Sequence, residues 1–224
     1  MTPMAVSRQV GVITTTQEVN LFFPRVDDWT KYRVNPLVLV TGDGHTLADD
    51  VKEFKSWGIP YDLYCVNRSL IFFEEQVQHW AALDTEESVW FAEHCNPKVE
   101  PKQMVNRHTI GDTLGGYDFA WEQVNDWKRE ESKRFFIGNT AYFAVLTSFY
   151  MGYEKVVLAG CPLDNKAHFY EPSGMVGPEW TGMMYCQWMD FKMKNKNADL
   201  VKSMGGYSAF ILGQATKEWA SVIG

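Results

Sequence analysis

The feature that most constrains the fold is an alternation of short apolar runs with amphipathic stretches, which becomes regular at Leu37. The run LVLVT at 37–41 leads into Gly-Asp-Gly, and residues 46–57 then carry apolar side chains at helical spacing up to Gly58. A strand, a tight loop and a helix in this order are typical of the first unit of an α/β fold.

The alternation continues to the end of the chain. We expect further strands at 61–66, 79–83, 104–110, 134–137, 155–160 and 207–212. We expect helices at 86–94, 119–131, 140–151 and 179–194, and a terminal helix after the last strand. This order predicts a single Rossmann-like α/β domain with a mostly parallel sheet, helices on both faces, and a loop/helix lid near 161–195. The domain is expected to span 37–224, with 1–36 as an N-terminal extension packed on it.

Composition narrows the classes of partner. The net charge is −7, and the one basic cluster, Lys192, Lys194 and Lys196, fits a helix end, so we expect no nucleic-acid partner. No apolar stretch approaches 18 residues and no signal-peptide pattern opens the chain, which predicts no transmembrane segment. The four cysteines lack CxxC spacing, which favours a reduced, cytoplasmic protein. A homo-oligomer is left open.

Small polar residues gather where the predicted strands end. Because ligands of such sheets bind at the carboxyl ends of the strands, we predict a binding site there. Its residues are Gly42, Asp43, Gly44, Thr46, Asn67, Asn139, Thr140 and Gly160. Each alone also fits a turn or a helix cap, and only their convergence on one rim predicts a site.

A nucleotide suits these residue types. A glycine loop lets backbone N–H groups approach phosphate oxygens, and the helix that starts at Thr46 directs its positive end to the same place. Asn67 both donates and accepts, which suits a base or ribose edge. No Lys follows the glycines, so the loop is not a P-loop, and the GxGxxG spacing is missing.

Three stretches resemble a known family in order and spacing. They are "LVTGDGHTL", "YDLYCVNRSLIFFEE" and "GNTAYFAVLTSFYMGYEKVVLAG". They resemble the bacterial sialyltransferases that build lipooligosaccharide, and equally the Rossmann-like group that includes archaeal 6-hydroxymethylpterin pyrophosphokinase. The resemblance covers residues 37–170, with a poorer match from 85 to 134. It implies a nucleotide-dependent transferase, most closely a glycosyltransferase that moves a sugar from a nucleotide-sugar to a small-molecule or glycan acceptor and requires no cofactor.

The resemblance also implies roles for single residues. Asn67 falls on the family's nucleotide-contacting Asn, and Asn139-Thr140 on its polar helix start. His168 falls on the general base, with Tyr170 beside it. In the first loop Gly42, Gly44 and Leu47 match the residues of the family, and Thr46 replaces its Ser. Asp43 and His45 differ from the residues that the family has at these two positions. The family's Gly-x-Asp after the late strand is Gly160-Cys161-Pro162 here.

Two alternatives stay open. A pyrophosphokinase-like enzyme would need Mg²⁺, for which Asp43, Asp84 and Asp164 are the candidate ligands. The other alternative is a nucleotide-binding protein of the same fold that does not catalyse a reaction. No HxxxH or HxH spacing supports a metal site built on histidine. We expect His79 at a strand edge, and Asp49 and Asp50 on a solvated helix face.

Overall fold

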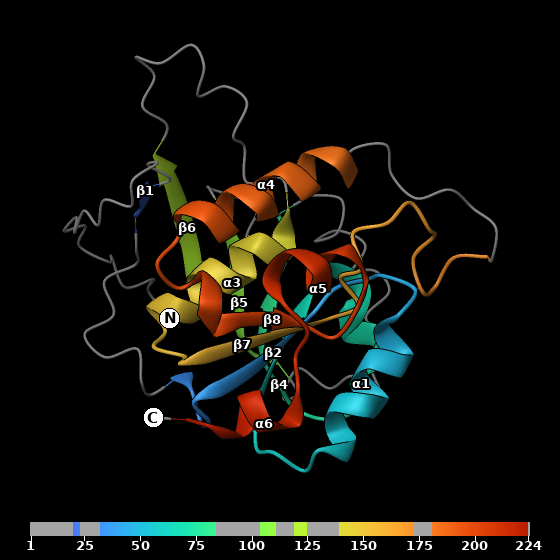
Figure 1. Cartoon of the computed structure of the whole chain (residues 1–224). Helices are drawn as coiled ribbons and strands as arrows, with labels where there is room; N and C mark the ends of the chain where they lie inside the picture. Colours follow the sequence, from blue (N-terminus) through green and yellow to red (C-terminus); the bar gives the residue numbers. More distant parts are fainter. Residues whose placement is uncertain are drawn as a thin grey trace.

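The computed structural model describes residues 20–22, 32–83, 104–110, 119–124, 139–172 and 181–223. Their strands form one twisted sheet in the order β1-β6-β5-β4-β3-β2-β7-β8, and every pair is parallel except β1 with β6 (Figure 1). The strands are β1 (Asn20–Phe22), β2 (Leu37–Thr41), β3 (Asp62–Val66), β4 (Val77–Ala81), β5 (Met104–Ile110), β6 (Phe119–Val124), β7 (Lys155–Ala159) and β8 (Val201–Ser203).

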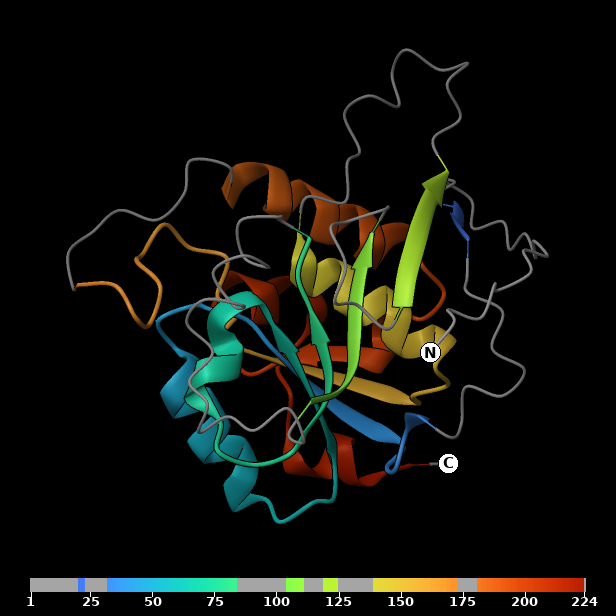
Figure 2. The same cartoon turned by 180° about the vertical axis from the view of Figure 1, so that it is seen from behind.

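Helices cover both faces of the sheet, as the sequence predicts. The helices are α1 (Leu47–Ser56), η2 (Asn67–Phe72), α3 (Thr140–Tyr150), α4 (Thr181–Lys194), η4 (Ala198–Leu200), α5 (Gly206–Leu212) and α6 (Lys217–Ser221). Helices α3, α4 and α5 pack in one core, and α1, η2 and α6 contribute to the other or pack against it. Seen from behind, the strands lie between these two layers (Figure 2). The chain is therefore a Rossmann-like α/β domain.

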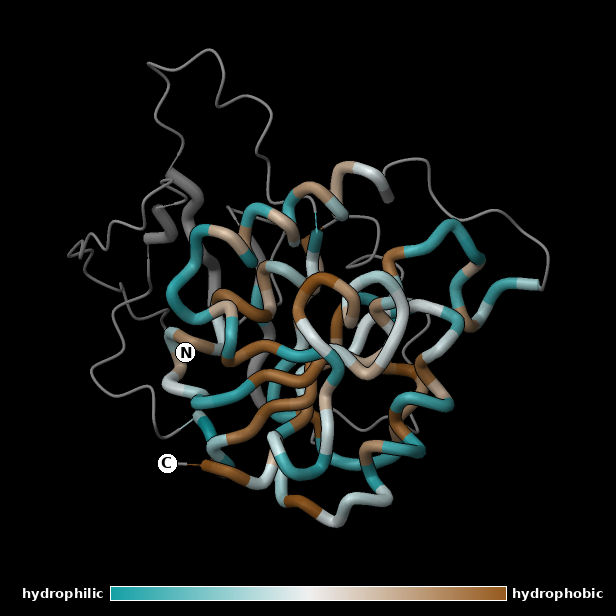
Figure 3. The backbone as a smooth tube through the Cα atoms, in the orientation of Figure 1, coloured by the Kyte–Doolittle hydropathy of each residue, from teal (hydrophilic) through white to brown (hydrophobic). Residues whose placement is uncertain are grey.

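Strand β2 shows why the sheet is buried on both sides. Its alternate side chains Val38 and Val40 enter the α3 core, whereas Leu37 and Leu39 enter the α1 core, and all four are fully buried. An apolar run without polar interruption is the pattern of a parallel strand covered on both faces. The hydropathy colours accordingly place the apolar strands at the centre of the molecule (Figure 3).

Two predicted elements are wrong. Residues 119–124 were expected in a helix and form strand β6, because pairing with β5 on one side and β1 on the other satisfies their backbone. Residues 207–212 were expected in a strand and form helix α5. Its buried residues Ser208, Ile211 and Leu212 follow helical spacing, and Gly213 ends it at φ +96°.

The last strand of the chain is the short β8, which pairs with β7 at the edge of the sheet. Strand β1 lies in the expected N-terminal extension and joins the sheet at its other edge. The helix predicted at 86–94 and the strand predicted at 134–137 lie outside the described residues.

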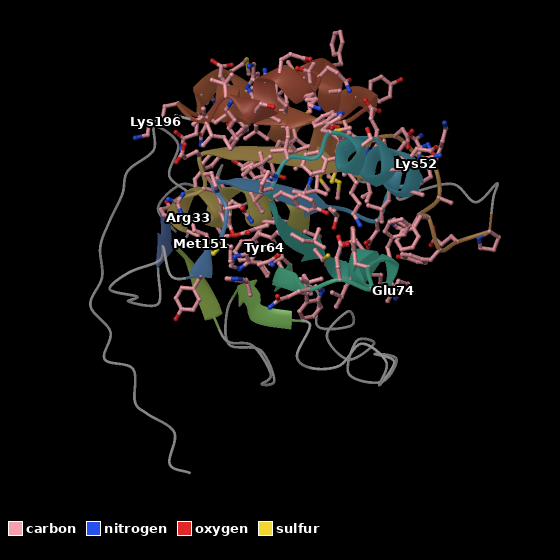
Figure 4. All side chains as sticks on the ribbon, turned by 90° about the horizontal axis from the view of Figure 1, so that it is seen from below. Arg33, Lys52, Tyr64, Glu74, Met151 and Lys196 are labelled. Atoms are coloured by element: carbon pink, nitrogen blue, oxygen red, sulfur yellow. The ribbon has the colours of Figure 1, made fainter. Side chains whose placement is uncertain are left out.

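His79 does not lie at a strand edge, and that prediction is wrong. Strand β4 is interior, between β3 and β5, and His79 is fully buried beside His108 of β5 and Tyr64 of β3. Figure 4 shows Tyr64 inside the molecule, with Lys52 and Glu74 at its periphery. A short run such as QVQHWAAL does not reveal which strands will flank it.

Candidate functional site

The strand order creates a crevice at the carboxyl edge of the sheet. Strands β2 and β7 are neighbours, but the chain leaves β2 for α1 on one face and leaves β7 for α4 on the other. Open α/β sheets bind ligands outside the carboxyl ends of the strands at such a point, where neighbouring strands lead to opposite faces. The hollow there is lined by the loops after β2, β3 and β7 and by the start of α3, and we call it the crevice.

Most of the predicted site residues line the crevice. They are Gly42, Asp43, Gly44, Asn67, Asn139, Thr140, Gly160, Asp164 and His168. Thr46 and Tyr170 are not part of its lining, and Asp84 lies outside the described residues. Four loops that are far apart in the sequence thus meet at one place.

The two glycines of the first loop serve close packing rather than phosphate approach. The N–H groups of Gly42 and Gly44 donate to the carbonyls of Ala159 (2.9 Å) and Gly160 (2.7 Å), so both are already engaged. A Cβ on Gly44 would lie 2.3 Å from Pro162 Cδ, and one on Gly42 would lie 2.6 Å from the Cys161 sulfur. The glycines therefore hold the loops after β2 and β7 against each other.

Asp50 was expected on a solvated face, and that prediction is wrong for this residue. Its Oδ2 accepts hydrogen bonds from the Gly160 N–H and from the Thr46 hydroxyl, each at 2.8 Å. Burial raises the pKa of the carboxyl above its usual value, against the lowering effect of the Gly160 and Thr46 hydrogen bonds. Gly160 itself needs a left-handed φ of +65°. Asp50 thus fastens the start of α1 to the turn after β7 and occupies the Thr46 hydroxyl.

Asn67 combines a left-handed backbone conformation with a buried polar side chain in the crevice. It adopts φ +50°, which is uncommon for a residue other than glycine, and its carbonyl accepts from the Trp80 indole at 2.9 Å. Its side-chain Oδ1 is buried and has no hydrogen-bond partner among the described residues. Buried acceptors are nearly always satisfied, and strained residues cluster at ligand sites. The crevice therefore offers an acceptor to a ligand N–H or O–H group.

Helix α3 points its N-terminus at the same crevice. Asn139 caps it by accepting from the Tyr142 N–H at 3.1 Å, and Asn139 and Thr140 are 5% and 6% exposed. The partial positive charge of a helix N-terminus attracts anions. Lys166 adds a formal positive charge to the lining.

The loop after β7 brings His168 across to the first loop. His168 forms an antiparallel bridge with Gly44, and the Phe169 N–H donates to the Asp43 carbonyl at 3.0 Å. The His168 ring nitrogen Nδ1 lies 3.0 Å from Glu171 Oε2, which also accepts from the His168 backbone N–H at 2.8 Å. A carboxylate at Nδ1 fixes the ring and leaves Nε2 as the nitrogen that can take a proton.

Glu171 was not among the predicted residues, although an acid three positions after His168 was the available signal. Tyr170 stacks on the His168 ring with centroids 5.3 Å apart and an interplanar angle of 13°. Arg68 covers the Tyr170 ring at 5.1 Å. The structure thus places Tyr170 against His168 as a support for the imidazole.

The carboxylates considered as metal ligands are only partly assembled. Asp43 and Asp164 both line the crevice, and His45 Nδ1 lies 3.7 Å from Asp164 Oδ1. Among the described residues no three His, Cys, Asp or Glu side chains are grouped so that they could hold a metal ion.

Comparison with known proteins adds no relative. No protein-family model matches the chain, and neither a curated protein nor a solved structure is similar enough to count as a match. The sialyltransferase-like and pyrophosphokinase-like resemblance therefore stays a prediction that rests on the quoted residues. Within the described part of the chain, no helix has the length and apolar character needed to cross a membrane.

Proposed function

We propose that this protein is a nucleotide-dependent transferase, most closely a glycosyltransferase that uses a nucleotide-activated sugar. The observation that carries the proposal is the position of His168. Its ring is held by Glu171, and it lines the same crevice as Asn67 and the N-terminus of α3. A proton acceptor and the elements of an anion site thus share one hollow.

The crevice offers suitable groups to the phosphate and to the base or ribose of a nucleotide-sugar. The N-terminus of α3, the Thr140 hydroxyl and Lys166 suit the phosphate, because all three can donate hydrogen bonds to an anion. The buried Oδ1 of Asn67 suits an amino group of the base or a ribose hydroxyl, since either would supply the donor that this atom lacks among the described residues.

The transfer step follows from the same groups. The acceptor hydroxyl oxygen forms the new bond to the anomeric carbon, and the bond from that carbon to the phosphate oxygen breaks. His168 Nε2 takes the hydroxyl proton, and the resulting imidazolium is stabilised by Glu171. The departing phosphate keeps the electron pair, and its negative charge is stabilised at the N-terminus of α3 and by Lys166.

A Mg²⁺-dependent pyrophosphokinase-like reaction is the second candidate, favoured by Asp43 and Asp164 on the wall of the crevice. The two candidates differ in metal dependence. EDTA should leave nucleotide binding intact under the first, whereas Mg²⁺ should be required under the second. Binding without any turnover would leave the non-catalytic alternative.

The test is a thermal-shift and calorimetric screen of nucleoside mono- and diphosphates, each with Mg²⁺ and with EDTA. A nucleotide at a hundred times its Kd should raise the free energy of unfolding by about 2.7 kcal/mol. The decisive variant is Asn67→Gly, because glycine tolerates φ +50° and lacks the buried Oδ1.

Asn67→Gly should fold with unchanged or higher stability and lose the response to the nucleotide. Val34→Ala, at a residue that is 79% exposed, is the control that should keep the response. Equal nucleotide affinity in Asn67→Gly and the wild type would overturn the assignment of the crevice.

A further inference from the structure

A second hollow adjoins the crevice, and we call it the side pocket. Tyr185 of α4, Tyr207 and Phe210 of α5, and the loop residue Asn165 contribute to its lining. Leu163 and Asp164 line both hollows, so a molecule in the side pocket would lie next to a molecule in the crevice. Its volume of about 660 Å³ is in the range of small-molecule sites.

The side pocket is held rigidly against the crevice. The Tyr207 N–H donates to the Pro162 carbonyl at 2.8 Å, and the Ser208 hydroxyl donates to the Cys161 carbonyl at 2.6 Å. Gly206 adopts φ +72° and approaches Pro162 so closely that a Cβ would lie 2.5 Å from the Pro162 Cα. The start of α5 is therefore fixed to the loop that forms the wall of the crevice.

Two of the three aromatic side chains in its lining are largely exposed. Phe210 is 81% exposed and Tyr207 is 57% exposed, and the Tyr185 and Tyr207 rings meet edge to face at 6.4 Å. Large aromatic groups normally bury much of their area, so an exposed group of them at the mouth of a hollow indicates a binding surface. Rings of this kind offer flat apolar faces against which the apolar face of a ligand can pack.

Charge separates the two hollows. The crevice has the Lys166 ammonium and His168 in its lining beside the carboxylates of Asp43 and Asp164, whereas the described lining of the side pocket has the Asp164 carboxylate and the Asn165 amide but no cation. A phosphate therefore fits the crevice and is disfavoured in the side pocket. Hydroxyl groups suit the side pocket, because a carboxylate accepts hydrogen bonds from them and an amide both donates and accepts hydrogen bonds.

We propose that the side pocket binds the acceptor, and that the acceptor presents a sugar ring there. A sugar ring combines an apolar C–H face, which packs on Tyr207 and Phe210, with hydroxyl groups that bond to Asp164 and Asn165. The role of this sugar as the acceptor rests on the proposed transferase function. Binding of the sugar ring in the side pocket does not depend on a nucleotide.

The experiment is saturation-transfer NMR on the full chain without nucleotide, with methyl glucoside, methyl galactoside, methyl mannoside and methyl N-acetylglucosaminide as probes. Saturation of the protein should transfer to the ring protons of at least one glycoside. The double variant Tyr207→Ala/Phe210→Ala should lose this transfer. Met193→Ala, on α4 and 69% exposed, should keep it.

Three results would overturn the proposal. The first is no saturation transfer to any of the glycosides, and the second is unchanged transfer in the double variant. The third is binding of indole in the side pocket without binding of a glycoside, because that would indicate a purely apolar pocket. Asn67→Gly separates this proposal from the nucleotide assignment. That variant should lose the nucleotide and keep the glycoside, so either proposal can fail while the other stands.

Discussion

His79 and His108 form a hydrogen-bonded pair inside the sheet, with 3.1 Å between His79 Nδ1 and His108 Nε2. The other nitrogen of His79 lies 2.9 Å from the Tyr153 hydroxyl, which donates to Asp62 Oδ2 at 2.7 Å. The Tyr153 oxygen must then accept from His79 Nε2–H, so His79 Nδ1 accepts from His108. Protonation of His79 at Nδ1 would remove the acceptor of this hydrogen bond.

This pair makes stability depend on pH. Burial lowers the pKa of His79 to about 3 and that of His108 well below its usual value. Both rings are neutral in the folded chain, while in the unfolded chain they take up protons as the pH falls through about 6.5. The stabilising effect of the neutral pair is thus complete above pH 6.5 and is lost progressively below it.

Between pH 7 and pH 5, uptake of a proton by His79 in the unfolded chain should lower the free energy of unfolding by about 2 kcal/mol. Uptake of a proton by His108 in the unfolded chain should lower it further. Urea unfolding at the two pH values measures the loss. His79→Phe removes one titrating group and should show a smaller loss over the same interval. Equal losses in the variant and the wild type would contradict the assignment.

Asp50 should be structurally important where its neighbour Asp49 is not. Asp50→Ala removes the acceptor for the Gly160 N–H and the Thr46 hydroxyl, and should cost about 1–3 kcal/mol of unfolding free energy. Asp49→Ala, at an exposed position of the same helix, should stay within about 0.5 kcal/mol of the wild type. Chemical denaturation of both variants decides the point, and equal effects would rule out the fastening role.

Gly44 should tolerate no side chain. Gly44→Ala places a Cβ 2.3 Å from Pro162 Cδ and 2.6 Å from the Gly160 carbonyl oxygen, so the two loops must separate, at a cost of about 1–3 kcal/mol. Gly182→Ala is the matched control, because no atom of the described residues outside its own helix backbone and chain neighbours lies within 4 Å of its built Cβ, and alanine favours a helix. Thermal unfolding should show a lower Tm only for Gly44→Ala, and an unaltered Tm there would mean that the loops pack differently.

Under the proposed function, His168→Ala should lower kcat by about 10²–10⁴-fold and leave nucleotide affinity nearly unchanged. Glu171→Gln should also lower kcat, because it weakens the hydrogen bond that orients the ring and stabilises the imidazolium. Tyr170→Phe keeps the stacked ring and should stay close to wild-type turnover. Sugar transfer measured under single-turnover conditions distinguishes these effects.

Near-normal turnover of His168→Ala would remove His168 from the chemistry. A large loss in Tyr170→Phe would show that the hydroxyl of Tyr170, and not only its ring, takes part in the reaction.

The local sequence pattern was sufficient to predict the strand and the helix that position the residues of the site. The apolar run at 37–41 predicted β2, and Asn139 before a long apolar stretch predicted α3 with its cap. Because ligands of such sheets bind at the carboxyl ends of the strands, the sequence also predicted most of the residues that line the crevice. These features depend on neighbours in the sequence, which is why sequence reasoning reached them.

The sequence by itself determined the alternating strands and helices, the α/β class and the rim on which the polar residues meet. Only the tertiary structure decided that 119–124 is a strand and 206–212 a helix, because pairing and packing partners outweigh weak local propensity in short segments. It also decided that His79 meets His108 and that Asp50 reaches Gly160, 110 positions away. Such contacts depend on which strands become neighbours, and no local pattern specifies the order of strands in a sheet.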